Sequence, residues 1–157
     1  MPSTKPFPTI VHPFDSPAGN ACAYESGLSD ARNSLVFIGG LFDGPNTVPY
    51  PRAIARRLES HPELSYSVFE FRLRSSFTGF GFQRLADDVE DTSALVKYLR
   101  SIGKEKVVLI GHSTGCQVFT LSFSLYIIYY MSLATPCSRS ADKTRILWNT
   151  PPLHTKT

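Results

Sequence analysis

The sequence predicts an α/β protein in which a mostly parallel sheet is flanked by helices. Short apolar runs typical of buried strands alternate with helical patterns along residues 21–117. The composition, with 42% hydrophobic and 18% charged residues, is that of a globular protein, and 157 residues are enough for one domain with a core. One apolar run ends in a glycine-flanked serine, a pattern found where a strand turns sharply into a helix.

Strands are predicted where apolar and β-branched residues gather between turn-forming residues. The Pro-rich residues 1–20 are expected to form an irregular N-terminal segment, with a short strand as its only regular part. The run at 34–38 ends in Gly39-Gly40, which indicates a buried strand that leads into a tight loop. The predicted strands are residues 9–11, 21–25, 34–38, 64–73 and 106–110.

Two amphipathic helices are predicted between these strands, over residues 47–60 and 83–101. Pro49 and Pro51 suit the first turn of the earlier helix, because the N–H groups of that turn have no helical partner. The later helix has an apolar stripe and several acids near its start, where the helix dipole favours negative charge. Gly103 is expected to end it.

The sequence Gly111-His112-Ser113-Thr114-Gly115 directly follows the last predicted strand and has the form G-x-S-x-G. A serine on such a turn has a strained backbone, and neighbours with side chains would collide there. Ser113 is therefore the candidate nucleophile, and Gly111 and Gly115 are the glycines of the elbow.

Three blocks of residues, in this order and spacing, resemble the α/β-hydrolase superfamily, and more narrowly an esterase-like branch found in fungi and plants. The blocks are VFIGGLFDG at 36–44 with VPY at 48–50, RSSFTGFG at 74–81, and GHSTGCQ at 111–117. The resemblance implies the N-terminal part of an α/β-hydrolase fold that is incomplete at its C-terminal end.

The resemblance also implies an activity and a site. It implies ester hydrolysis through an acyl-enzyme on Ser113, with siderophore esters as one substrate class, since a fungal member of the branch is associated with them. The oxyanion would be held by the backbone N–H of Thr114 and by an N–H from the Gly40-Leu41 loop. No cofactor and no metal are implied.

The chain departs from the superfamily pattern after Gln117. Members continue with further strands, then an acid and a late histidine, and the residues left after Ser113 are too few to hold several βα units. Asp142 and His154 occur in the right order and are the candidate triad partners, against the alternative that they occur there by chance.

The C-terminal part is therefore expected to be foreign to the family, through truncation or mis-splicing. The predicted organisation is a partial hydrolase domain over residues 21–135 and an irregular tail over 136–157. The chain is then a catalytically incomplete serine hydrolase, with a non-catalytic fragment as the alternative.

Other polar residues have simpler explanations than catalysis. His112 is expected to pack beside the strand end, and His12 to be solvated in a Pro-flanked segment. The acids at 87–91 are expected on a solvated helix face rather than around a metal ion. Ser75 and Ser76 either line a substrate cleft or serve ordinary turn chemistry.

The expected partner is a small-molecule ester. The formal net charge is only +3 and basic residues are scattered, which argues against nucleic-acid binding. Three cysteines without metal-ligand spacing, Cys22, Cys116 and Cys137, are typical of reduced thiols in a cytoplasmic protein. The apolar run 118–134 is interpreted as a buried helix, with a membrane tether as the less favoured alternative. The oligomeric state is not predicted.

Overall fold

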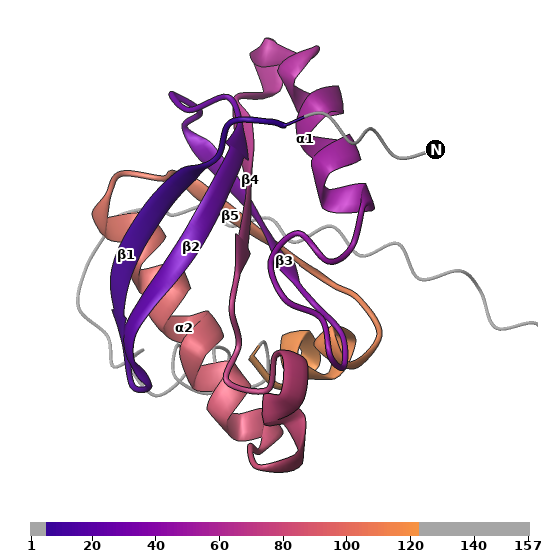
Figure 1. The fold of residues 1–157 in the computed structure, drawn as a ribbon. Coiled ribbons are helices and arrows are strands. Elements are labelled where there is room, and N and C mark those ends of the chain that lie inside the picture. The colour runs from indigo at the N-terminus through magenta and orange to yellow at the C-terminus, as the bar shows by residue number, and fades with distance from the viewer. Residues whose placement is uncertain (1–5, 123–157) are drawn as a thin grey trace, which may run out of the picture.

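The computed structural model describes residues 6–122, which contain one five-stranded sheet in the order β1-β2-β4-β3-β5 (Figure 1). β1 and β2 form an antiparallel pair, and β2 is also antiparallel to β4. β3 lies between β4 and β5 and is parallel to both, so the sheet is mixed and its parallel part leads to the elbow. The strands are β1 (Ile10–Ser16), β2 (Gly19–Gly27), β3 (Asn33–Ile38), β4 (Tyr66–Phe71) and β5 (Lys106–Gly111).

The hairpin of β1 and β2 corrects the prediction that residues 1–20 are irregular. The residues from Ile10 onward belong to the sheet. Pro13 is compatible with this because β1 is an edge strand, where a missing N–H need not break a ladder. Ser16 pairs with Gly19 across a two-residue connection, and Gly19 takes a φ of +93°, which a residue with a side chain rarely adopts.

The two predicted helices are confirmed as α1 (Tyr50–Glu59) and α2 (Leu85–Ser101), on opposite faces of the sheet (Figure 1). Gly103 follows α2 with a φ of +90°, as expected for a C-terminal cap. Two short 3-10 helices, η1 (Pro62–Leu64) and η2 (Phe77–Gly81), occupy the connections, and a further helix begins at Thr114.

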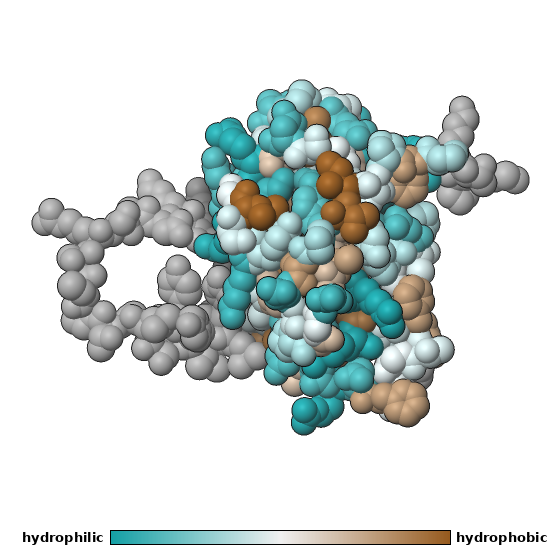
Figure 2. Space-filling view, turned by 60° about the vertical axis from the view of Figure 1, so that its left-hand side comes forward, coloured by the Kyte–Doolittle hydropathy of each residue, from teal (hydrophilic) through white to brown (hydrophobic). Residues whose placement is uncertain are grey.

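The main core lies between the sheet and α2. Its residues come from the strands, from α2, from the loop after β4 and from the helix after the elbow, and all of them are apolar and buried. They are Phe14, Ala23, Val36, Ile38, Phe69, Phe71, Leu73, Val89, Leu95, Leu99 and Val118. Because Val118 belongs to the helix after the elbow, the core reaches directly beneath Ser113. The face drawn in Figure 2 is mainly hydrophilic with separate brown groups, so no continuous apolar patch crosses it.

Two of the acids of α2 do not lie on the solvated face that the sequence suggests, whereas Glu90 is exposed there. Asp88 and Asp91 are buried, with 2% and 3% exposure. Asp88 accepts the N–H of Ser75, and Asp91 accepts the N–H and the Nε–H of Arg74, each at 3.1 Å. Asp91 also accepts the hydroxyl of Ser16 at 2.7 Å. These acids therefore fasten the loop after β4 and the hairpin to α2.

His12 is not solvated either, because it belongs to a buried polar network. Its Nε2 lies 2.8 Å from Glu25 Oε2, and its Nδ1 lies 3.1 Å from the Tyr98 hydroxyl. The ammonium group of Lys104 donates to Glu25 Oε1 at 2.9 Å and to Ser67 Oγ at 3.2 Å. Glu25 and Lys104 are only 3% and 8% exposed, so this ion pair lies inside the protein.

In the described part of the chain, no helix is long and apolar enough to cross a membrane. Most of the apolar run 118–134, and the whole predicted tail 136–157, lie outside the described residues.

Candidate active site

Ser113 occupies a sharp turn between β5 and the helix that begins at Thr114. Its φ is +52°, in the left-handed region that a residue with a side chain enters only at a cost of about 1–2 kcal/mol. The residue is exposed, so the turn presents the hydroxyl to solvent at the carboxyl end of the parallel strands. This is the backbone geometry that the G-x-S-x-G pattern predicts.

Gly111 and Gly115 are required by close backbone contacts. A Cβ on Gly111 would lie 2.6 Å from the carbonyl oxygen of Gly115. A Cβ on Gly115 would lie 2.2 Å from the oxygen of Ile38 and 2.5 Å from that of Gly39. The first glycine lets the chain fold back on itself, and the second lets the new helix touch the end of β3.

The loop after β3, residues 39–44, is here called the oxyanion loop, and it lies against Ser113. A Cβ on Gly40 would be 2.9 Å from the Cβ of Ser113 and 3.2 Å from the oxygen of His112. Gly40 therefore brings the loop backbone into direct contact with the elbow. Residues more than 70 positions apart in the sequence meet here because β3 and β5 are neighbours in the sheet.

The backbone N–H groups of this region fall into two kinds. The N–H of Gly40 donates to Asp43 Oδ2 at 2.7 Å, so it is already engaged. The N–H groups of Leu41 and Thr114 donate to no atom of residues 6–122. Of the three residues predicted to form the oxyanion hole, Leu41 and Thr114 thus have free donors beside Ser113, whereas Gly40 contributes close packing.

The contacts of His112 with described residues are those of a packed side chain rather than of a catalytic base. Its ring stacks on Phe37, with centroids 6.4 Å apart, and meets the edge of Tyr50 at 5.6 Å. Its Nε2 lies 4.0 Å from Asp43 Oδ2. The Ser113 hydroxyl makes no hydrogen bond to another described residue. The candidate partners Asp142 and His154 lie outside the described residues, so their placement stays a prediction.

A cavity of about 220 Å³ opens beside the elbow and the oxyanion loop. Its lining includes Leu41, Thr114 and Gln117, together with Ser75 and Asp88. Ser75 therefore lines a cleft at the site and also holds its loop in place through the bond from its N–H to Asp88. Burial raises the pKa of Asp88, although hydrogen bonds from Ser75 oppose this shift.

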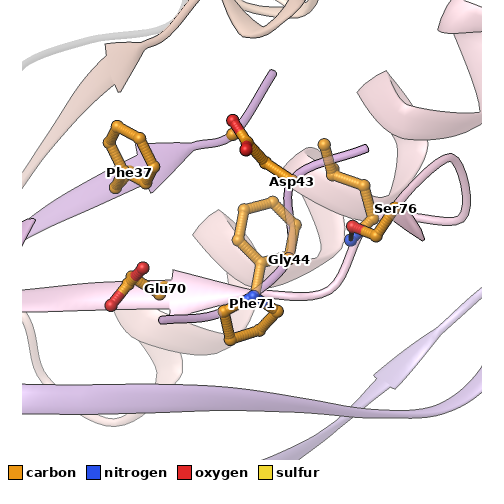
Figure 3. A pocket seen from close by; sticks show the side chains of 9 residues that line it. Phe37, Asp43, Gly44, Glu70, Phe71 and Ser76 are labelled. Carbon is orange, nitrogen blue, oxygen red and sulfur yellow. Dashed lines mark hydrogen bonds between the residues drawn. The ribbon is translucent and has the colours of Figure 1, made fainter. Parts of the chain in front are cut away.

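A second, much smaller cavity, of about 10 Å³, lies on the other side of the oxyanion loop (Figure 3). Glu70 of β4 faces it, together with Asp43 and Ser76 from the loops that follow β3 and β4. Glu70 is 5% exposed, and burial raises its pKa, while the N–H of Asn46 donates to its Oε1 at 3.1 Å and opposes the shift. The volume is close to that of one water molecule.

Sequence reasoning overlooked Asp43, which occurs inside the loop motif but carries no signal of its own. The buried positions of Asp88 and Asp91 were also missed, because a run of acids at the start of a helix is typical of a solvated face. A signal was present in the sequence: Arg74 follows a β-rich run, and acids follow it on a predicted helix. Such a pair suggests a loop held to the helix by carboxylates.

The topology and the strand-to-helix turn define the class of protein: this chain has the α/β-hydrolase fold. The chain belongs to the family described as "Protein of unknown function (DUF1749)", whose model matches residues 1–145.

Proteins from fungi are similar to it. An esterase of Emericella nidulans, AN6793, is 32% identical over 126 residues, covering 74% of this chain and 32% of the relative. The fusarinine C esterase sidJ of Aspergillus fumigatus is 31% identical over 113 residues, covering 66% of this chain and 29% of the relative. Among solved structures, the siderophore hydrolase EstB from Aspergillus fumigatus superposes with a TM-score of 0.62 at 26% identity.

The match is to one part of these longer proteins. The superposition on EstB covers 78% of this chain and 39% of EstB. The chain thus spans about a third of the length of the relatives it matches.

Proposed function

We propose that the chain provides the nucleophile and the oxyanion hole of a serine esterase. The observation that carries this proposal is the left-handed Ser113, exposed at the elbow and packed against Gly40 of the oxyanion loop. A serine with only a structural role gains nothing from a strained backbone on an exposed turn, whereas a nucleophile needs to be presented there.

The reaction follows from the arrangement. The Ser113 oxygen would attack the ester carbonyl carbon, its proton passing to a base, and the negative charge that develops on the carbonyl oxygen would meet the N–H groups of Leu41 and Thr114. The C–O bond to the alcohol then breaks, and the alcohol leaves with a proton. Water would attack the acyl-enzyme in the same way and release the acid and Ser113.

The substrate is proposed to be a small ester of the siderophore type. This part of the proposal is supported by the names of two similar proteins, the fusarinine C esterase sidJ and the siderophore hydrolase EstB. The cavity beside Leu41 and Thr114 offers room for an acyl or alcohol group next to the nucleophile.

If the chain carries its own base, His154 oriented by Asp142 is the candidate, because the order Ser, Asp, His is that of the superfamily; otherwise the chain is a catalytically incomplete hydrolase. The alternative is a fold that binds a partner without catalysis. It is favoured by one observation, that no described side chain makes a hydrogen bond to the Ser113 hydroxyl.

A fluorophosphonate probe on the full 157-residue chain distinguishes the two. An active esterase is labelled, and Ser113→Ala abolishes the labelling. His154→Ala should slow labelling at least about a thousandfold if this histidine is the base. A folded wild-type chain that is not labelled would favour the non-catalytic alternative.

A further inference from the structure

We propose that Asp43 is a positioning residue that aims the N–H of Leu41 at the oxyanion and withdraws the N–H of Gly40 from it. This inference rests on the proposed function for its consequence in catalysis, whereas its structural half concerns the oxyanion loop alone.

Asp43 closes a four-residue turn from both sides. Its N–H donates to the carbonyl oxygen of Gly40 at 3.1 Å, and its carboxylate Oδ2 accepts the N–H of Gly40 at 2.7 Å. The second bond is short and charge-assisted, and such bonds are about twice as strong as neutral ones. Phe42, inside the turn, takes a φ of +64°, so the turn is held against backbone strain.

The first of these bonds, a main-chain bond, sets the direction of the Leu41 N–H, and the carboxylate bond to Gly40 holds the same turn closed. In a trans peptide the C=O and the N–H of one unit point in opposite directions. The carbonyl of Gly40 and the N–H of Leu41 belong to the same unit, and the carbonyl is directed at Asp43. The N–H of Leu41 must therefore point away from Asp43, which leaves it free of partners among the described residues.

The position of Gly40 places this peptide unit at the nucleophile. A Cβ on Gly40 would lie 2.9 Å from the Cβ of Ser113 and 3.1 Å from Asp43 Oδ2, so only a glycine leaves room for both. The carboxylate is held there by the N–H of Gly40 and by the Thr47 hydroxyl, which donates to Oδ1 at 3.4 Å, and His112 Nε2 lies 4.0 Å from Oδ2.

The small cavity behind the loop shows why a carboxylate and not a bulkier group fits. Asp43 lines it with Glu70 and Ser76 (Figure 3), and a Cβ on Gly39 would lie 2.9 Å from the Cβ of Asp43. The side chain is therefore confined on the Gly39 side, and its two oxygens have separate donors: the N–H of Gly40 for Oδ2 at 2.7 Å and the Thr47 hydroxyl for Oδ1 at 3.4 Å.

The test uses NMR and probe labelling of the full chain. Asp43→Ala should speed hydrogen exchange of the Gly40 amide about ten- to a hundredfold, as loss of a hydrogen bond to a charged group implies. It should also slow fluorophosphonate labelling of Ser113 at least about tenfold. The main-chain bond to Gly40 alone no longer holds the turn against the strain at Phe42, so the Leu41 peptide unit loses its fixed orientation. Asp43→Asn, which keeps an acceptor oxygen, should restore labelling to within about threefold of wild type while the Gly40 amide proton loses its downfield shift.

The control is Asp30→Ala, since Asp30 is exposed and makes no hydrogen bond to a described residue. Unchanged Gly40 exchange in Asp43→Ala would overturn the proposal, and so would faster exchange with labelling at the wild-type rate. If wild type is not labelled at all, the proposed function fails, and the exchange and chemical-shift data alone decide the structural half. If Asp43→Ala does not fold, Asp43→Asn decides through the loss of the Gly40 shift.

Discussion

Replacing Gly115 by alanine tests whether close packing of the elbow helix on β3 builds the site. The added Cβ would lie 2.2 Å from the oxygen of Ile38, at least 0.8 Å short of the 3.0 Å that real Cβ contacts keep, and 2.5 Å from that of Gly39. Both obstacles are backbone atoms, so no side chain can rotate away. The helix must retreat from the strand, and Ser113 and Thr114 must move with it.

Two effects of opposite sign determine how Gly115→Ala changes the free energy of unfolding. Alanine is better than glycine in a helix by about 1 kcal/mol, which would stabilise the variant. Overpacking against a rigid neighbour costs about 1–3 kcal/mol, and two backbone contacts place this case at the upper end. We therefore expect Gly115→Ala to lower the free energy of unfolding by about 2 kcal/mol, and to slow labelling of Ser113.

Urea unfolding followed by far-UV circular dichroism measures the change. Gly81→Ala is the matched control, because a Cβ there meets no heavy atom within 4 Å. Its stability should stay within about 0.5 kcal/mol of wild type. If Gly115→Ala were instead more stable by about 1 kcal/mol and labelled normally, helix propensity alone would govern the position and the packing argument would be refuted.

Three further predictions concern strain and buried charge. Ser113→Gly should raise the free energy of unfolding by about 1 kcal/mol, because it relieves the left-handed backbone, while it abolishes probe labelling; no gain in urea stability would contradict the strain argument. Lys104→Ala should cost about 3–5 kcal/mol in the same assay, because it leaves the carboxylate of Glu25 buried without its cation, whereas the exposed Lys97→Ala should have little effect. Burial raises the pKa of Glu70 above its ordinary 4.5, so the unfolded chain loses this proton first and stability falls as pH rises from 4.5 toward the folded pKa. Glu70→Gln should therefore be more stable than wild type at pH 7 and gain less at pH 4; an equal difference at both pH values would show that the carboxyl titrates normally.

Local patterns predicted the strands and helices that surround the elbow. The apolar run before Gly39 and the stripe of α2 were recognisable because burial imposes a period that residues close in sequence share. Strands were predicted at 9–11 and 21–25, but the full length of β1 and its pairing with β2 were not, because Pro13 and the polar residues of β1 break the alternation, and an edge strand needs little of it. Its place in the sheet depends on pairing with β2, which in turn pairs with β4 much later in the chain.

At the candidate site, too, some features follow from the sequence alone and others only from the tertiary structure. The sequence alone determined the nucleophile turn, because G-x-S-x-G after a strand is a local requirement of backbone geometry that a few adjacent residues satisfy. It could not determine which N–H groups remain free or that the N–H of Gly40 donates to Asp43. It also could not determine that Asp88 and Lys104 are buried. Those features follow from which strands become neighbours and how closely a loop and a helix approach, and such contacts between distant residues exist only once the sheet has formed.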